Sequence, residues 1–328
     1  MPDQTMCVNA SLREVSLAAV DLADRSLAVT AGRDTRALER SIARCGLLNP
    51  LLLAPRQHGT GYRVVCGVLR AQALAALGRT TCTARVAGSD VPESLLLLVA
   101  LSDNAAHRRC NAVEKARAAA LLMAHYPESE AVRLCAELTG VPPTMTACRQ
   151  YRDLAAADAR LHELLLAEQV TIDTAFALCA MTHEDRACFM RLFSIARFSA
   201  RKQDEIVEMC ADISRRDAVP LRHALEHPDV RHCMEAPSAG NAAQTAEQVR
   251  RCLRLQRFPR LAQRERKVQE TIRRLRMPAG ITLEPPPYFE GGRWRCVVQV
   301  AAPGDVRAAA GELALLAGRA ELAELLRE

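Results

Sequence analysis

Two short segments of the chain combine residue types that could bind a phosphorylated ligand. The first, Gly67-Val68-Leu69-Arg70, lies where a predicted strand, Tyr62 to Cys66, turns into a helix. A glycine there lets backbone N–H groups approach an anion at the helix N-terminus, and an arginine one turn later can bind it. The same four residues would also suit an ordinary tight turn followed by a surface arginine. The segment by itself leaves both readings open.

The second segment begins at Asp103, where a carboxylate and an amide precede basic side chains. Asp103 and Asn104 offer the oxygen ligands that Mg²⁺ prefers. His107 and Arg108 follow them and could contact phosphates. For Arg108 a solvated surface charge is the alternative reading. The segment therefore predicts a metal and phosphate site, with that alternative kept open.

A third segment, Ser129 to Leu154, has the spacing of a helix-turn-helix. Ala136 would permit a close helix crossing, Gly140 would make the turn and Val141 would fill the core. The polar side chains of the second helix could then bond to base edges or phosphates in a DNA major groove. They are those of Thr144, Thr146, Arg149, Gln150 and Arg152. An ordinary α-hairpin is the alternative for the segment read alone.

The elements that must position these residues follow from hydrophobic periodicity. The first hundred residues alternate strands with helices, which predicts a small α/β domain. Strands are expected at Val15–Leu22, Leu47–Leu53, Tyr62–Cys66 and Cys82–Val86, and helices at Thr35–Cys45, Val68–Leu77 and Pro92–Ala106. Gly46 is expected to cap a helix C-terminus, and Asn111 with Glu114 to form a capping box.

The rest of the chain reads as mainly helical. Short helices are expected from Ala112 to about His227, then a linker at Pro228 and Ala236–Ala243 because small residues and proline resist helix. The tail reads as a helix, two strands and a helix, at Leu261–Arg276, Ile281–Glu284, Trp294–Val300 and Val306–Leu326. The predicted fold class is mainly α with a small α/β N-terminal domain. The expected domains are an α/β domain at 1–110, a helical DNA-binding domain at 111–235, a linker and basic segment at 236–260 and a C-terminal α-β-β-α module at 261–328.

Charge is concentrated in one part of the sequence. The 328 residues carry a net charge of +6, which is modest. From Asn241 to Met277, however, eleven basic residues accompany three acidic ones, so this segment alone is +8. Such a segment would bind phosphates without regard to base sequence. It therefore predicts double-stranded DNA as a partner.

The cysteine pattern and the hydropathy of the chain indicate the cellular compartment of the protein. The thirteen cysteines are scattered singly without a CxxC motif, which fits unpaired thiols in a reducing cytoplasm and makes a zinc site unexpected. No N-terminal basic and apolar signal segment is present, and the longest apolar run, Leu95 to Leu101, is too short to span a bilayer. The sequence predicts a cytoplasmic, nucleoid-associated protein without membrane contact.

The order of the three segments resembles the ParB partition family. Leu38 to Pro50 is similar to that family's opening segment, Tyr62 to Gly78 to its GERRxRA phosphate box, and Asp103 to Ala116 to its ENxQRxDLNPxEEA box. The helix-turn-helix follows at the expected place, and Ala167 to Leu178 is similar to the segment that leads to a helix behind the DNA reader. The resemblance covers about Leu12 to Ala180 and the tail only in element order.

In this family the N-terminal domain binds CTP with Mg²⁺ and closes a dimeric clamp around DNA. The resemblance therefore implies a nucleotide site at Gly67, Arg70, Asn104, His107 and Arg108, with Asp103 and Asn104 at the metal. It also implies a homodimer held by the C-terminal module, a partition ATPase as a partner and CTPase activity.

Several positions depart from the family pattern. Val68 and Leu69 stand where the family has Glu and Arg, Gln72 replaces an Arg, Asp103 replaces Glu, and His107 replaces the Arg of ENxQR. Each charge-assisted bond lost in this way is worth about 1.5 to 3 kcal/mol, which puts hydrolysis and nucleotide binding in doubt. Pro142-Pro143 also adds a residue to the helix-turn-helix, so the family's base contacts do not transfer.

The predicted function is that of a ParB-like DNA-binding partition protein, with a CTP-gated clamp as its further form. A helix-turn-helix transcription regulator without a nucleotide gate is the alternative. A metal nuclease is a third class, but such enzymes gather several carboxylates around their ions. Here the region offers Asp103 and Glu114.

Overall fold

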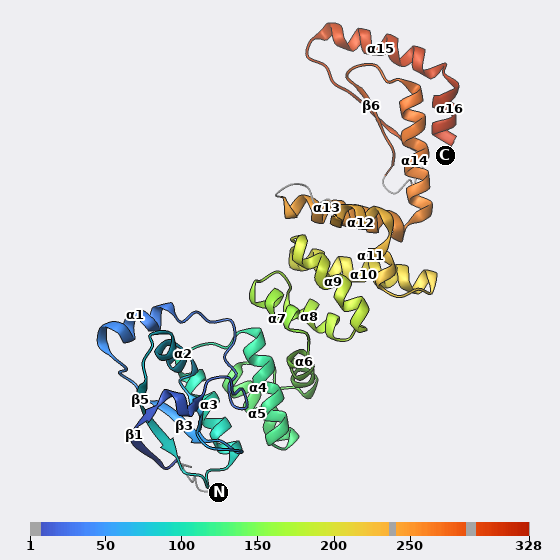
Figure 1. Cartoon of the computed structure of the whole chain (residues 1–328). Coiled ribbons are helices and arrows are strands. Elements are labelled where there is room, and N and C mark those ends of the chain that lie inside the picture. Colours follow the sequence, from blue (N-terminus) through green and yellow to red (C-terminus); the bar gives the residue numbers. More distant parts are fainter. Residues whose placement is uncertain (1–7, 236–240, 287–292, 328) are drawn as a thin grey trace. The chain divides into compact units, whose positions relative to one another are not determined.

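The structure is a computed structural model that describes residues 8–235, 241–286 and 293–327. The chain forms two compact units, Met1–Asp204 and Glu205–Glu328 (Figure 1). Helices predominate, and the first unit contains a small mixed sheet near its N-terminus. The predicted fold class is therefore confirmed at this level. The predicted domain boundaries stay predictions.

The sheet of the first unit has five strands in the order β1-β5-β3-β4-β2. Their bounds are β1 Ala10–Ser16, β2 Val20–Asp21, β3 Leu51–Pro55, β4 Tyr62–Cys66 and β5 Thr81–Ala87. β1 pairs antiparallel with β5 and β3 antiparallel with β4, whereas β3 with β5 and β2 with β4 are parallel. Alternate residues of β5 (Cys82, Ala84 and Val86) are buried in the core of this sheet, as the period of two requires.

The predicted strand Val15–Leu22 is wrong as a single strand. A turn of 3-10 helix at Leu17–Ala19 divides it into β1 and β2, which lie at opposite edges of the sheet. Three residues span at most about 10 Å, so the sheet must curl until its two edges approach each other. β2 lies close against its neighbour β4, because a Cβ atom on Gly61, just before β4, would lie 2.5 Å from the carbonyl oxygen of Ala19, just before β2.

Three helices accompany the sheet: α1 Arg36–Cys45, α2 Val68–Ala76 and α3 Glu93–His107 (Figure 1). Gly46 caps α1 with φ of 74°, as predicted. The buried guanidinium of Arg63 on β4 joins that strand to α3, because its Nη1 donates to Glu93 Oε1 at 2.7 Å. The strand and the helix that carry the two phosphate-binding segments are therefore held together.

The remaining helices of the first unit are short, as predicted. They are α4 Ala112–His125, α5 Glu128–Thr139, α6 Met145–Ala155, α7 Ala159–Leu166, α8 Ile172–Cys179 and α9 His183–Ile195, and α10 Ala200–Asp217 contains the division between the units. The capping box of Asn111 and Glu114 at the start of α4 is confirmed. Buried alanines at Ala116 and Ala119 let α4 pack closely against α5 and α6.

The second unit departs from prediction in two places. Its further elements are α11 Arg222–Glu226, α12 Pro228–Glu235, α13 Ala242–Arg257, α14 Pro259–Leu275, β6 Ile281–Glu284, β7 Arg295–Val298, α15 Pro303–Ala317 and α16 Ala320–Arg327. Pro228 begins a helix, where its missing N–H costs nothing, and α13 occupies most of the expected linker and basic segment at 236–260. Residues 236–240 of that linker lie outside the described residues. The helix expected at Val306–Leu326 is two helices, because Gly318 ends α15.

The C-terminal elements follow the predicted order. β6 has its predicted bounds, and β7 is shorter than expected, pairing Ile281 with Val298 and Glu284 with Arg295 in an antiparallel hairpin. Figure 1 shows this hairpin beside α14 and α15. Arg274 of α14 pairs with Glu324 of α16 at 3.2 Å. No helix in the described ranges is both long and apolar enough to cross a membrane.

Candidate functional site

The two predicted phosphate-binding segments converge on one pocket of about 260 Å³ in the first unit. Gly67 and Arg70 reach it from the start of α2, and Asp103, Asn104 and His107 from the end of α3. Residues separated by some forty positions in sequence thus line the same cavity. The structure brings together every residue of the predicted nucleotide and metal set except Arg108.

Sequence reasoning assigned no ligand contact to the other half of the lining, although Val68 and Leu69 lie within the predicted segment Gly67–Arg70. The other residues that surround the pocket are Thr30, Leu38, Asn49, Val68 and Leu69. Asn49 belongs to the segment Leu38–Pro50, which resembles the opening segment of the family, so the sequence did indicate the region that contains it. Thr30 lies in a stretch without helical or strand periodicity, and only the fold places it here.

The side chain of Arg70 already makes hydrogen bonds within the protein. Its Nη1 donates to the carbonyl oxygens of Asn49 at 2.8 Å and Pro50 at 3.0 Å. A Cβ atom on Gly67, whose φ is +95°, would lie 3.0 Å from the Cζ of Arg70, so the guanidinium folds back over the start of α2. It occupies the place where an anion would meet the helix N-terminus. The Nη1 group is occupied by these two carbonyls, and no hydrogen bond from the Nη2 or Nε group of Arg70 is found among the described residues.

The side-chain amide of Asn104 also makes hydrogen bonds within the protein. Its Oδ1 accepts from Arg108 Nη2 at 3.0 Å, and its Nδ2 donates to the carbonyl oxygen of Ala100 at 2.8 Å. The oxygen predicted to bind a metal is therefore paired with a guanidinium. Within the described part of the chain, no group of three His, Cys, Asp or Glu side chains could hold a metal ion.

The pocket does not fit a magnesium triphosphate. Among its lining residues Arg70 is the single permanent cation, and the carboxylate of Asp103 opposes it. Even with the charge of a bound Mg²⁺ counted, one arginine opposed by a carboxylate would leave much of the negative charge of a triphosphate without a fixed cation. The polar groups that remain suit a neutral ligand or one with a single anionic group.

Cys66, at the end of β4, borders the pocket as a neutral thiol. Burial, together with the nearby carboxylate of Asp103, raises the pKa of Cys66 to about 12. At neutral pH the sulfur is protonated and is a poor nucleophile. The thiol of Cys66 is therefore a poor candidate for covalent catalysis.

Arg108 points into a network centred on the fully buried carboxylate of Glu114. Glu114 Oε2 accepts from Arg108 Nη1 at 2.6 Å and from Arg33 Nη2 at 2.9 Å. The backbone N–H groups of Ala31 and Asn111 complete its hydrogen bonds. Burial opposes ionisation, but these donors outweigh it and hold the pKa of Glu114 below its ordinary value of 4.5. Glu114 thus ties the segment before α1 to the start of α4.

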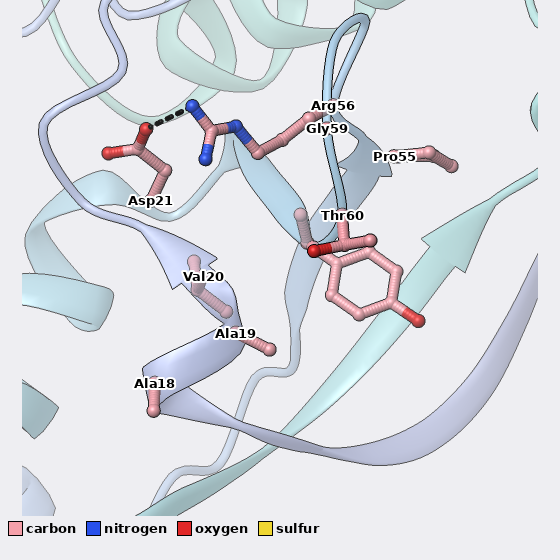
Figure 2. Close-up of a pocket in the computed structure, with 10 residues that line it drawn as sticks. Ala18, Ala19, Val20, Asp21, Pro55, Arg56, Gly59 and Thr60 are labelled. Carbon is pink, nitrogen blue, oxygen red and sulfur yellow. Dashed lines mark ion pairs between the residues drawn. The ribbon is translucent and has the colours of Figure 1, made fainter.

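A second hollow, of about 770 Å³, lies where the two edges of the sheet approach each other (Figure 2). Its charged lining residues are Asp21 and Arg56, which pair with each other at 3.1 Å. The dashed line in Figure 2 marks this pair, and Thr60 and the small side chains of Ala18 and Ala19 line other parts of the hollow. The hollow offers no convergent set of reactive groups.

The turn expected at Gly140 and Val141 is present between α5 and α6, while the role of this segment as a DNA-binding helix-turn-helix stays a prediction. Gly140 ends α5 in the left-handed conformation with φ of 70°, and Val141 is 1% exposed in the core. Thr144 is the N-cap of α6, because its Oγ1 accepts from the N–H of Ala147 at 3.2 Å. That predicted DNA contact therefore has a structural role. Pro142 and Pro143 stand between the core residue and the cap, both exposed.

One face of α6 is buried and the other is exposed. Ala147, Cys148, Tyr151 and Leu154 face the core. The exposed face carries Thr146, Arg149, Gln150 and Arg152. The helical period accounts for this separation. The predicted reading side chains are therefore accessible together on one helix.

The arginines of this motif are paired with acids. Arg149 pairs with Glu128 of α5 at 3.5 Å, and Arg152 with its neighbour Asp153 at 2.8 Å. From Glu128 to Ala155 three basic residues face four acidic ones, a net charge of −1. The exposed amide of Gln150 makes no hydrogen bond to another described residue. This surface has the donors of a base reader but little attraction for phosphates.

The basic segment shows the opposite character. On α13 and α14 several cations are neutralised, such as Arg257 by Asp212 and Arg250 by Glu205 at 2.8 Å. Six other arginines are exposed and pair with no acid in the described ranges. They are Arg251, Arg254, Arg260, Arg266, Arg273 and Arg276. These six guanidinium groups form the candidate phosphate-binding surface.

Comparison with known proteins gives a distant likeness. No family model matches the chain, and no curated protein matches it in sequence. Among solved structures, the truncated chromosome-partitioning protein ParB from Caulobacter crescentus complexed with CTP-gamma-S is 19% identical, with a TM-score of 0.28 over 56% of this chain and 99% of that one. The same protein complexed to the centromeric parS site is 15% identical, with a TM-score of 0.33 over 59% and 97%. A Pnob8-like ParB-N domain is 15% identical, with a TM-score of 0.36 over 70% and 98%.

Proposed function

We propose that this protein binds a specific double-stranded DNA site through α6. The observation that carries the proposal is the exposed face of α6, where Arg149 and Gln150 stand one helical turn from a capped N-terminus. Arginine and glutamine can make bidentate contacts to guanine and adenine in the major groove. The resemblance to the ParB family makes partition the biological setting, with a homodimer and a partition ATPase as further partners.

Genomic DNA bound to the protein and then sequenced tests the proposal and separates its two forms. A broad signal around one locus supports a partition protein that spreads from its site. Isolated narrow peaks support the alternative, a transcription regulator. Uniform recovery of all sequences contradicts site-specific binding by α6.

The homodimer belongs to the same proposal and rests on exposed apolar side chains in the C-terminal elements. Val300, Val306, Leu315 and Leu326 are each more than half exposed. A two-stranded hairpin with helices is too small to bury such surface alone, and a second copy would cover it. The alternative is a tail that packs on its own chain. Light scattering on the full chain and on a chain ending at Glu235 distinguishes the two alternatives. A shortened chain that is still a dimer would show that the tail does not hold the dimer together.

Gating by CTP is the part of the family resemblance that the pocket supports least. We expect no magnesium-dependent binding of CTP, because Arg70 and Asn104 are committed and further cations are lacking. Calorimetry with CTP and Mg²⁺ on the parent and on Arg70→Ala tests this. Tight binding that needs Mg²⁺ and is lost in the variant would support the nucleotide gate.

The nuclease class is tested by incubating plasmid DNA with the protein and Mg²⁺. Persistent nicking by the pure protein would support a nuclease.

A further inference from the structure

The described cysteines include two pairs of neighbouring thiols, and the pairs differ in access to solvent. Cys233 of α12 and Cys252 of α13 have their sulfurs 4.0 Å apart, and both side chains are half-buried. Cys135 of α5 and Cys148 of α6 are also hydrogen-bonded neighbours, but both are fully buried. The chain thus contains an accessible pair and an inaccessible one.

The helices around the accessible pair are held in register by their own core. Val230 and Met234 of α12 and Val249 and Leu253 of α13 are buried. These contacts place Cys233 and Cys252 at the rim of the same interface. The two sulfurs are in van der Waals contact, whereas a disulfide needs them at about 2 Å. Because α12 has only eight residues, a small rotation of side chains or helix can close that gap.

We propose that Cys233 and Cys252 form a thiol–disulfide exchange site whose substrate is a small-molecule disulfide. One thiolate attacks a sulfur of the reagent RSSR, which forms a mixed disulfide and releases one RS⁻. The second cysteine then attacks the protein sulfur of that mixed disulfide and releases the second RS⁻. The protein loses two hydrogens, the reagent gains them as two RSH, and α12 becomes bonded to α13.

The reaction is slow at neutral pH and faster in base. Burial, with the neighbouring thiol of Cys233 and the carboxylate of Asp229, raises the pKa of Cys252 to about 11, although Arg251 opposes the shift. The thiolate is therefore scarce at neutral pH. The site responds to sustained oxidant rather than to a brief pulse.

The full chain is incubated with oxidised glutathione at about pH 8.5 to raise the thiolate fraction, and remaining thiols are then alkylated. Peptide mapping is expected to link Cys233 to Cys252, without glutathione on either, while Cys135 and Cys148 are recovered as thiols. The link closes a separation of 19 residues, and it should raise the unfolding midpoint by on the order of 5 °C. Reduction with dithiothreitol should reverse the shift.

Two variants make the result specific. Cys252→Ser is expected to retain glutathione on Cys233, because the second attack has no sulfur. Cys148→Ser, the matched change in the buried pair, is expected to form the Cys233–Cys252 link like the parent. Persistent glutathione on Cys233 of the parent, or a Cys135–Cys148 link at equal yield in the folded chain, would overturn the proposal.

Discussion

The predicted helix-turn-helix, α5 and α6, and the basic helices of the second unit, α13 and α14, differ in the charge and in the side chains that they present to solvent. The first has a fixed geometry, in which a capped helix presents Arg149 and Gln150, but its net charge is −1. The second has six exposed arginines that pair with no acid in the described ranges, on α13, on α14 and just beyond it. Under the proposed function, sequence recognition and phosphate attraction therefore lie in different parts of the chain.

This separation has a physical advantage. A cationic reading helix would bind any duplex tightly, since phosphate contacts carry no sequence information. The pairing of Arg149 with Glu128 makes approach to a phosphate less favourable, and a base edge must compete with that carboxylate. Discrimination then depends on hydrogen bonds, whereas residence on DNA depends on charge elsewhere.

The largest effect is expected from removing the six unpaired arginines together by Arg→Gln substitution. Six phosphate contacts correspond to a slope of log affinity against log salt of roughly −5, or about a thousandfold between about 50 and 200 mM salt. The variant should lose this slope and bind all duplexes weakly. Fluorescence anisotropy across a salt series measures it. The matched control, Arg→Lys at the same positions, should keep the slope, and an unchanged slope in the Gln variant removes the role of these helices.

The next largest effect is expected on the stability of the first unit, through the hydrogen-bond network of Glu114 at the start of α4. Glu114→Gln leaves Arg33 and Arg108 without their buried carboxylate, which should cost about 3 to 5 kcal/mol of unfolding free energy. Because the folded pKa of Glu114 is depressed, its contribution is complete above its ordinary pKa of 4.5 and is lost as pH falls through the folded pKa. Urea unfolding of parent and variant at several pH values measures both.

A parent whose excess stability over Glu114→Gln persists well below the folded pKa of Glu114 would contradict this account of the network. Asp34→Asn is a matched control, since Asp34 pairs with Arg36 on the exposed surface and should change stability little.

Smaller losses are expected on the reading face. Arg149→Ala and Gln150→Ala should each weaken binding to the specific site by about 1 to 3 kcal/mol and leave the salt slope almost unchanged. Footprinting and titration on the selected site measure this. Arg133→Ala, which removes an exposed arginine of α5 paired with Glu137 at 2.7 Å, is the control and should bind normally. If both α6 variants protect the same site at parental affinity, α6 is not the reader.

The smallest effect concerns the cap of that helix. Thr144→Ala removes the acceptor for the N–H of Ala147 and should cost about 1 kcal/mol of stability. Thr144→Ser keeps the oxygen and should recover most of it. Thermal unfolding compares the three proteins. A loss of DNA affinity in Thr144→Ser as large as in Thr144→Ala would point to a direct contact instead of a cap.

Short-range signals predicted the parts of the fold that they control. Gly46, Gly140 and the capping box of Asn111 and Glu114 fixed helix ends because their chemistry acts within one turn. Proline misled at Pro228, since a residue that resists the middle of a helix is well tolerated at its first position. The division of Val15–Leu22 was not predictable, because its two parts pair with different strands that are distant in sequence, β1 with β5 and β2 with β4.

The pocket was predictable in membership and not in function. Gly67, Arg70, Asp103, Asn104 and His107 do gather, as the two segments indicated. What no pattern revealed is that Arg70 binds the carbonyls of Asn49 and Pro50, and that Arg108 turns to Glu114. Long side chains choose partners across the fold, so the state of charge in a pocket depends on tertiary structure.

The most direct test of the separation measures site discrimination and salt slope in the same three proteins: the parent, the double variant Arg149→Ala/Gln150→Ala, and the six-arginine Gln variant. Each is titrated with the selected duplex and a scrambled duplex across a salt series. The α6 variant should lose discrimination and keep the slope, whereas the six-arginine variant should lose the slope and keep the ratio between the two duplexes. If one of the two variants loses both properties while the other loses neither, recognition and attraction reside in a single surface.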